Sequence, residues 1–147
     1  MALDKNAVEM THDTLTIVHT KEFGWVPWAM PGTWFKLLHA EERSGRFTIL
    51  IKVDPGNKAP THRHIKAVEV YILEGGFFYT DDPNIRFDVD SYLYEHDAAI
   101  HKPESPLGCI MFAVFHGPLE GVAEDGKTSL GQLDAKWHID KWAELHT

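Results

Sequence analysis

Apolar and polar residues alternate in several short runs along this chain. The clearest are residues 46–53 (RFTILIKV), 68–73 (VEVYIL) and 109–116 (CIMFAVFH), which are rich in the β-branched and aromatic residues that strands favour. Weaker runs of the same kind lie at residues 15–17, 34–39, 62–64, 77–80 and 92–94. Many short strands separated by turns predict an all-β sandwich or barrel.

Glycine, proline, aspartate and asparagine gather between these runs. They mark turns or loops at residues 24–34, 41–45, 54–57, 74–76, 81–84, 96–108 and 120–126. The segment 24–34 (GWVPWAMPGTW) carries three tryptophans, and we expect a loop or sheet edge held in place by its indole rings. We expect the EGG of residues 74–76 to end one strand, so that residues 77–80 return from the turn.

The two ends of the chain differ from this pattern. Residues 1–13 are a polar lead-in, and residues 137–145 predict a short closing helix with Ile139, Trp142 and Leu145 roughly on one face. Histidines in these polar ends, such as His138, are expected to be solvated.

Composition narrows the class of protein. A chain of 147 residues can form one domain with a sizeable core, and its net charge of −8 argues against a nucleic-acid or anionic-membrane partner. Cys109 is the single cysteine, so no intrachain disulfide is expected. With no signal-peptide core and no apolar run of about 18 residues, we expect a cytoplasmic protein. The predicted domain spans residues 1–147, with an arm at 1–32, a core barrel at 33–119 and a tail at 120–147.

The unusual feature of the composition is ten histidines. His62 and His64 are separated by one residue, which on a strand turns both imidazoles to the same face, where they can bind one metal ion. Glu69 follows His64 by five positions and would face away on an unbroken strand, so it can share the site only if residues 65–68 turn or bulge. His101, at the start of the loop before Cys109, is the best candidate for a third ligand.

The segment 56–76 (GNKAPTHRHIKAVEVYILEGG) resembles the first sequence motif of the cupins, G-x5-H-x-H-x3,4-E-x6-G. The five matching positions are Gly56, His62, His64, Glu69 and Gly76. The second cupin motif survives only at His101, which cupins use as a metal ligand. The resemblance implies a cupin-type double-stranded β-helix, or jelly-roll barrel, here with a short C-terminal helix.

Residues 95–119 (EHDAAIHKPESPLGCIMFAVFHGPL) look like the corresponding region of a narrower group, the acetylacetone-cleaving (β-diketone) dioxygenases among the small cupins. That likeness implies an iron(II) site on His62, His64 and His101, with Glu95, six residues before the third histidine, as the catalytic carboxylate near the pocket. Such a carboxylate can accept the α-proton of a diketone or orient a ligand histidine through its ring N–H. Glu69 stays open as a fourth ligand. On the last clear strand the resemblance favours the face of Met111, Ala113 and Phe115 as pocket wall.

The implied activity is cleavage of a carbon–carbon bond in a β-diketone or related small ketone by O2. Imidazole ligands do not specify the metal, so purified protein could carry Zn(II) or Ni(II) in place of Fe(II). The implied partners are the small-molecule substrate and O2, and we expect a homodimer or homotetramer. One alternative is a non-enzymatic zinc-binding cupin with a sensor or regulatory role. Another is a different metal-dependent enzyme in the same barrel, because one fold hosts many functions.

Overall fold

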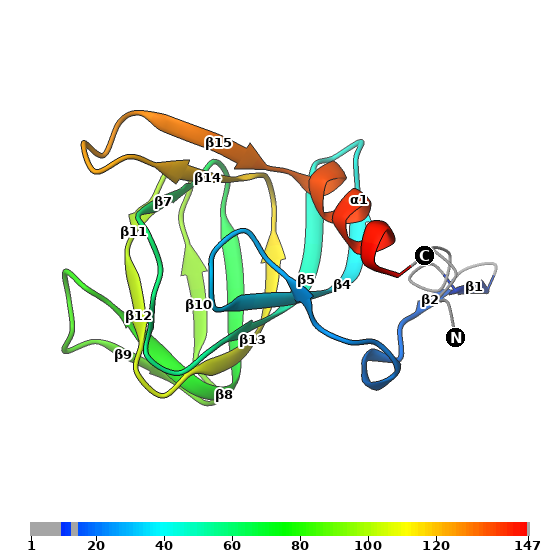
Figure 1. Cartoon of the computed structure of the whole chain (residues 1–147), viewed down its shortest axis with the longest axis horizontal. Helices are drawn as coiled ribbons and strands as arrows, with labels where there is room; N and C mark the ends of the chain where they lie inside the picture. Colours follow the sequence, from blue (N-terminus) through cyan, green and yellow to red (C-terminus); the bar gives the residue numbers. More distant parts are fainter. Residues whose placement is uncertain (1–9, 13–14, 147) are drawn as a thin grey trace.

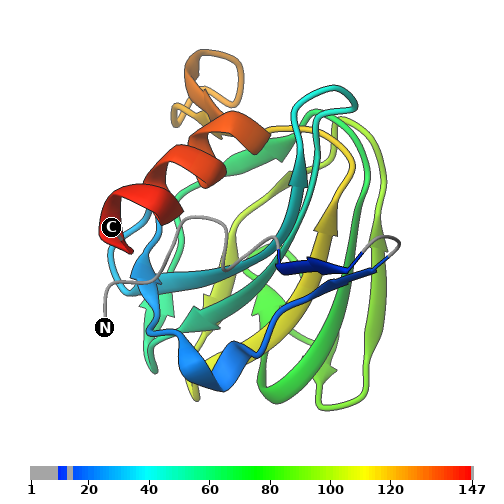
Figure 2. The ribbon, with the colours of Figure 1, turned by 90° about the vertical axis from the view of Figure 1, so that its right-hand side faces the viewer.

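Antiparallel sheets wrapped around one hydrophobic core make up most of the molecule, and one helix packs on the outside (Figures 1 and 2). The computed structural model describes residues 10–12 and 15–146. Within this part of the chain the strands curl into the jelly-roll barrel that the sequence predicted. Residues 1–9 and 13 of the polar lead-in lie outside the described residues.

The largest sheet contains nine strands. Its main path is β3 (Val26–Pro27), β4 (Thr33–Glu41), β5 (Arg46–Val53), β13 (Cys109–Phe115), β8 (Val68–Tyr79), β12 (Pro103–Ser105) and β6 (Asn57–Lys58), with β9 (Arg86–Asp88) and β10 (Tyr92–Glu95) also paired to β8. A second sheet has the order β11 (Ile100–His101), β7 (His62–His64), β14 (Leu119–Val122) and β15 (Ser129–Leu133). A separate pair joins β1 (Met10–His12) to β2 (Leu15–Ile17).

The alternation seen in the sequence decides which face of each strand is buried. Alternate residues of β4, β5 and β13 point into the barrel, and Phe35, Phe47, Ile49 and Ala113 are fully buried there. Burying a large apolar side chain contributes about 1.5–3 kcal/mol, so these strands supply much of the stability of the fold. The short segment Val26–Pro27 forms an edge strand, as expected for a proline-containing stretch.

The predicted turn at residues 74–76 is wrong. β8 continues through these residues, because one extra residue at Leu73 makes a bulge opposite β13 and bends the strand without reversing it. Gly75 adopts φ +66°, and a Cβ there would lie 2.0 Å from the carbonyl oxygen of Gly108. The two glycines therefore allow a bend and a close backbone approach, and the chain reverses only after Tyr79.

The strands that the sequence did not predict are short or mostly exposed. β11 and β12 lie inside the segment expected to be a loop, and β14 and β15 form a hairpin around the expected turn region after Leu119. Strands of two or three residues are too short to show alternation, and the residues of β15 are mostly exposed, so no buried face marks it.

The C-terminal helix α1 (Ala135–Leu145) begins two residues earlier than predicted, because the Asp134 side chain accepts a hydrogen bond from the backbone N–H of Trp137 at 2.8 Å. α1 packs against β4 and β5, and its buried face consists of Ala135, His138 and Trp142. Leu145 is exposed. None of the helices in the described ranges has the length and apolar character needed to cross a membrane.

His138 is fully buried, which contradicts the expectation that it is solvated. Its Nδ1–H donates to the carbonyl of Asp134 at 2.7 Å, and its Nε2 accepts from Trp28 Nε1 at 3.0 Å. The ring stacks on Phe47 with centroids 4.0 Å apart. Both ring nitrogens are satisfied by the neutral imidazole, and burial lowers the pKa of His138 to about 4.

Candidate metal centre

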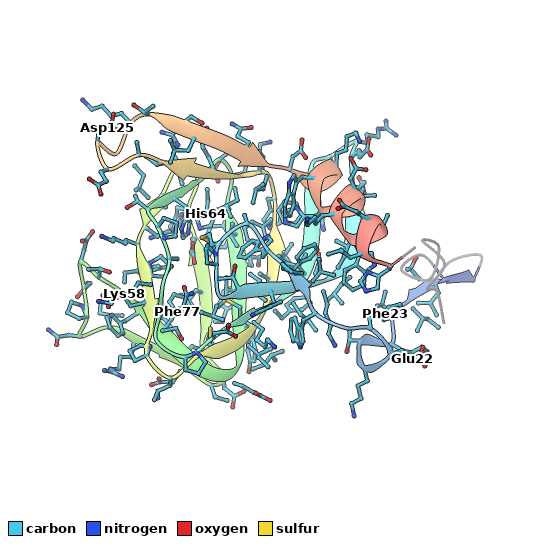
Figure 3. The ribbon with its side chains drawn as sticks, viewed as in Figure 1. Glu22, Phe23, Lys58, His64, Phe77 and Asp125 are labelled. Atoms are coloured by element: carbon cyan, nitrogen blue, oxygen red, sulfur yellow. The ribbon has the colours of Figure 1, made fainter. Side chains whose placement is uncertain are left out.

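Strand β7 directs His62 and His64 into the barrel. The two imidazoles are 9% and 3% exposed, with ring centroids 5.0 Å apart, while Arg63 between them points to the other face and pairs with Glu120. This is the period-two alternation of a strand. Figure 3 shows His64 inside the barrel.

The third histidine reaches the same place through strand pairing. β11 runs antiparallel to β7 with His101 directly opposite His62, and the His101 ring lies 5.5 Å from that of His64 and 6.3 Å from that of His62. The three imidazoles that the sequence singled out are therefore neighbours, although His101 follows His64 by 37 positions in the chain.

Glu95 brings a carboxylate into the cluster. It ends β10, on the same inward face as Leu93, and its Oε2 lies 2.6 Å from His64 Nε2 and 3.2 Å from His101 Nε2. Two ligand atoms at 90° around a metal with bonds of about 2.1 Å would be about 3.0 Å apart. Both observed separations are close to this value. Among the described residues, His64, Glu95 and His101 thus form a group of three ligand atoms that lie within 4.8 Å of one another and could hold a metal ion.

Four buried polar atoms of this cluster lack a hydrogen bond of acceptable geometry to any described residue: His64 Nδ1, His64 Nε2, Glu95 Oε2 and His101 Nε2. Unsatisfied buried polar atoms are costly, and natural proteins seldom leave them without a ligand, ion or water. Three of the four face one another at ligand-to-ligand distances. The residues present therefore fit a bound metal ion.

The ionisation of the cluster also suits a cation. Burial, with a smaller contribution from His64, lowers the pKa of His62 to about 4, and burial lowers the pKa of His101. For Glu95, burial acts to raise the pKa, but the His64 imidazole and the Tyr79 hydroxyl outweigh it, so the pKa is lower than usual. The shifts favour neutral imidazoles at His62 and His101 and an ionised carboxylate at Glu95, which are the protonation states that metal ligands require.

Hydrogen bonds outside the cluster orient its members. His62 Nδ1–H donates to the carbonyl of Pro60 at 3.2 Å, which leaves the Nε2 lone pair free to bind a metal. The Tyr79 hydroxyl donates to Glu95 Oε1 at 2.7 Å, which leaves Oε2 facing the histidines. The Tyr79 ring also stacks on His101. Sequence reasoning missed Tyr79, because its position depends on the unexpected continuation of β8.

Glu69 lies away from the cluster. Residues 65–67 do separate β7 from β8, but Glu69 falls on the outer face of β8. Its carboxylate accepts from the Tyr92 hydroxyl and pairs with His116 Nε2, each at 2.7 Å. The structure therefore gives Glu69 a surface network in place of the fourth-ligand position left open by the sequence.

A cavity of about 80 Å³ adjoins the metal cluster, and most of its wall is apolar. Met111 and Phe115 from the predicted pocket face line it, together with Val68, Val70 and Phe77. Ala113 is fully buried and does not reach this wall. His62, His64, Tyr79 and Glu95 supply its polar end. A space of this size suits a small ligand with an apolar body and a few polar atoms.

The buried thiol of Cys109 also lines this cavity, and burial raises its pKa to about 11. It is therefore protonated at neutral pH and acts as an apolar wall residue.

The jelly-roll barrel and its buried histidine cluster define a cupin. A family model described as the ChrR cupin-like domain matches residues 13–120, which is most of the chain. The chain therefore belongs to this family of cupins. A comparison with curated proteins gave no match.

Solved structures share the fold. A protein of Methylibium petroleiphilum PM1, assigned provisionally as an acetylacetone dioxygenase, is 23% identical with a TM-score of 0.81, over 90% of this chain and 97% of that chain. An acetylacetone dioxygenase from Acinetobacter johnsonii is 18% identical with a TM-score of 0.78, over 93% and 95%. The matched chain in the Rhodobacter sphaeroides complex of SigE with the anti-sigma ChrR is 18% identical with a TM-score of 0.54, over 67% and 51%. At these identities the similarity concerns the fold.

Proposed function

We propose that this cupin is an iron(II)-dependent dioxygenase that uses O2 to cleave a carbon–carbon bond of a β-diketone or related small ketone. The observation that carries the proposal is the convergence of buried, unsatisfied atoms of His64, His101 and Glu95, because His64 and Glu95 also line a small, mostly apolar cavity. His62, with its Nε2 free, would complete a three-histidine set.

Bound iron(II) would supply a Lewis acid and the electron that O2 chemistry needs. The roles of the protein are then binding, orientation and proton transfer. The three imidazoles are neutral ligands, so they leave the charge of the cation available to an anionic enolate oxygen pair.

Glu95 is the residue to which we assign the proton transfer. Its pKa is lowered, so Oε2 is ionised and able to accept the proton on the carbon between the two ketone groups. Tyr79 fixes the other carboxylate oxygen and thereby aims Oε2 at the site. The apolar wall around Phe77, Met111 and Phe115 limits water and favours a small ligand with little charge.

Two of the solved structures that share this fold over nine tenths of the chain carry the name acetylacetone dioxygenase, which supports this choice among cupin activities. The likeness of residues 95–119 to that group supports it independently.

A zinc-binding regulatory cupin is the second candidate, favoured by the family model, whose description refers to ChrR, an anti-sigma factor in the structure that matches this fold. In that case the same histidines would hold zinc without turnover, and a partner protein would respond to occupancy of the site.

One experiment separates the two functions. Metal-free protein is reconstituted anaerobically with iron(II), and O2 consumption is followed with a panel of β-diketones and acyl phenols. We expect uptake coupled to stoichiometric loss of one β-diketone. Absence of uptake with every compound, together with tight zinc retention, would overturn the dioxygenase and support the regulatory function. A matched zinc-loaded sample shows whether any uptake needs the redox-active metal.

A further inference from the structure

The outer face of the nine-stranded sheet carries a row of directly paired residues that runs across five strands. Lys36 on β4 pairs with Leu50 on β5, Leu50 with Phe112 on β13, Phe112 with Tyr71 on β8, and Tyr71 with Tyr92 on β10. Directly paired residues point to the same face of a sheet, so these five side chains form one continuous stripe. We call it the outer row.

The outer row is unusually apolar for a surface. Phe112 is 37% exposed, Tyr71 38% and Tyr92 58%, and the exposed side chains of Leu73 and Tyr94 adjoin them. A hollow of about 340 Å³ lies among Glu69, Val70, Tyr71, Tyr92, Phe112 and Val114. Contiguous exposed apolar surface with a concave part marks an interaction site more often than scattered surface residues do.

Charge divides this face into two halves with Phe112 between them. Lys36 and Lys52 lie on the β4 and β5 side. Lys52 stands over the rings of Trp25 and Trp34, whereas Lys36 stands over Trp25 and donates to the carbonyl of Thr20 at 2.7 Å. Acidic groups lie on the other side, namely Asp90 beside Tyr71, Glu69 beside Tyr92, and Glu74 on β8. Ile110 on β13 pairs with Lys52 on β5 and with Glu74 on β8. Lys52 and Glu74 therefore each lie one strand away from β13, on opposite sides of it.

We propose that a second copy of this chain docks face to face on the outer row, around a two-fold axis that runs along β13. Such an axis reverses the strand order of the second copy, but each row of paired residues still lies opposite the same row of the other copy. Phe112 then meets Phe112, and Leu50 meets Tyr71. In the neighbouring row Lys52 meets Glu74. The basic half of each copy therefore covers the acidic half of the other, in the aligned arrangement common for packed sheets.

The N-terminal strands support the same partner. β1 and β2 pair only with each other among the described strands, and Leu15 and Ile17 of β2 are exposed. Figure 2 shows them passing in front of β13 and β8, and Figure 1 shows them standing away from the barrel. An isolated two-stranded hairpin is marginally stable in water. The second copy on the outer row gives this arm a surface to pack against.

Phe112 at the axis gives the first test, by sedimentation velocity of the metal-loaded protein over a concentration series. We expect the wild type to be a dimer or a dimer-based assembly, and Phe112→Arg to raise the dissociation constant by more than about 30-fold. The control is Leu130→Arg, at another exposed leucine on β15, which should leave association unchanged. A monomeric wild type, or an assembly broken by Leu130→Arg and spared by Phe112→Arg, would overturn the proposal.

Charge exchange tests the register. Lys52→Glu and Glu74→Lys should each weaken the dimer several-fold to about tenfold, and the double variant should restore it. Restoration in the double variant requires that the two positions meet across the interface. Additive weakening would reject the two-fold axis along β13. Far-UV circular dichroism and metal content, measured on every variant, distinguish loss of association from loss of fold. Association does not depend on the proposed enzyme activity.

Discussion

The phenol ring of Tyr79 lies almost parallel to the imidazole of His101, with centroids 4.3 Å apart and an interplanar angle of 13°. The same tyrosine holds Glu95 through its hydroxyl. One side chain thus positions a candidate ligand and the candidate base at once. Because stacking and hydrogen bonding use different parts of the residue, substitution can separate them.

We expect Tyr79→Phe to keep metal affinity within about tenfold and to slow turnover, because the ring still stacks while Glu95 loses its partner. Tyr79→Leu removes both contacts and should weaken metal binding by about 10–100-fold. Competition with a chromogenic chelator measures the affinities. Equal metal affinity in the two variants would show that stacking on His101 does not help to hold the metal.

Removal of any one imidazole should empty the site. His62→Ala, His64→Ala and His101→Ala are each expected to lose most of the metal found in the wild type by elemental analysis. His116→Ala is the control, since His116 pairs with Glu69 on the outer face. Full metal content in His101→Ala would mean that another residue is the third ligand.

Glu95→Gln should retain metal and lower turnover by about 10²–10⁴, because the amide preserves shape but cannot accept the substrate proton. Glu69→Gln is the matched control, a carboxylate on the same sheet with no contact to the cluster, and should keep normal activity. A metal-free Glu95→Gln protein would instead identify Glu95 as a ligand, in agreement with its short distances to His64 and His101.

His138 should make stability depend on pH. Burial lowers its pKa from 6.5 to about 4, so below pH 6.5 the unfolded chain binds a proton that the folded protein excludes. The stability is fully present above pH 6.5 and falls as the pH approaches 4, at up to about 1.4 kcal/mol per pH unit.

His138→Gln removes this titration but also the buried contacts of the ring. Its cost in unfolding free energy should therefore be about 2 kcal/mol smaller at pH 5 than at pH 7, by urea denaturation of metal-free protein. A cost that does not change with pH would show that the buried imidazole takes up a proton without resistance.

A comparison of Gly75 with Gly45 separates the cost of a steric overlap with the backbone from the cost of a positive φ. Both have positive φ, but a Cβ at Gly45 meets nothing within 4 Å, whereas at Gly75 it would overlap the Gly108 carbonyl. Gly45→Ala should cost about 1 kcal/mol, and Gly75→Ala about 2 kcal/mol more. Thermal unfolding checks this, and equal losses would mean that β8 and the loop before β13 separate easily.

Much of the barrel could be predicted from the sequence, because long strands with one buried face show a clear alternation of apolar and polar residues. The runs that became β5 and β13 alternate over seven or eight residues, so periodicity alone located them and their inner faces. The same alternation turns Arg63, between the two inward histidines, to the other face of β7, where it pairs with Glu120. The prediction at residues 74–76 was wrong because it rested on composition, which indicated a turn. In the structure a bulge opposite β13 lets the strand continue through these residues.

The sequence by itself determined the strand that carries His62 and His64, because alternation is a local property of the backbone. It also supplied His101 and Glu95 as candidates through resemblance. Only the tertiary structure decided that these residues meet, since the pairing of β11 and β10 joins segments far apart in the chain. It also moved Glu69 to the outer face and brought Tyr79 to the cluster. Both outcomes depend on where β8 begins and how far it runs, which long-range pairing sets and local composition does not.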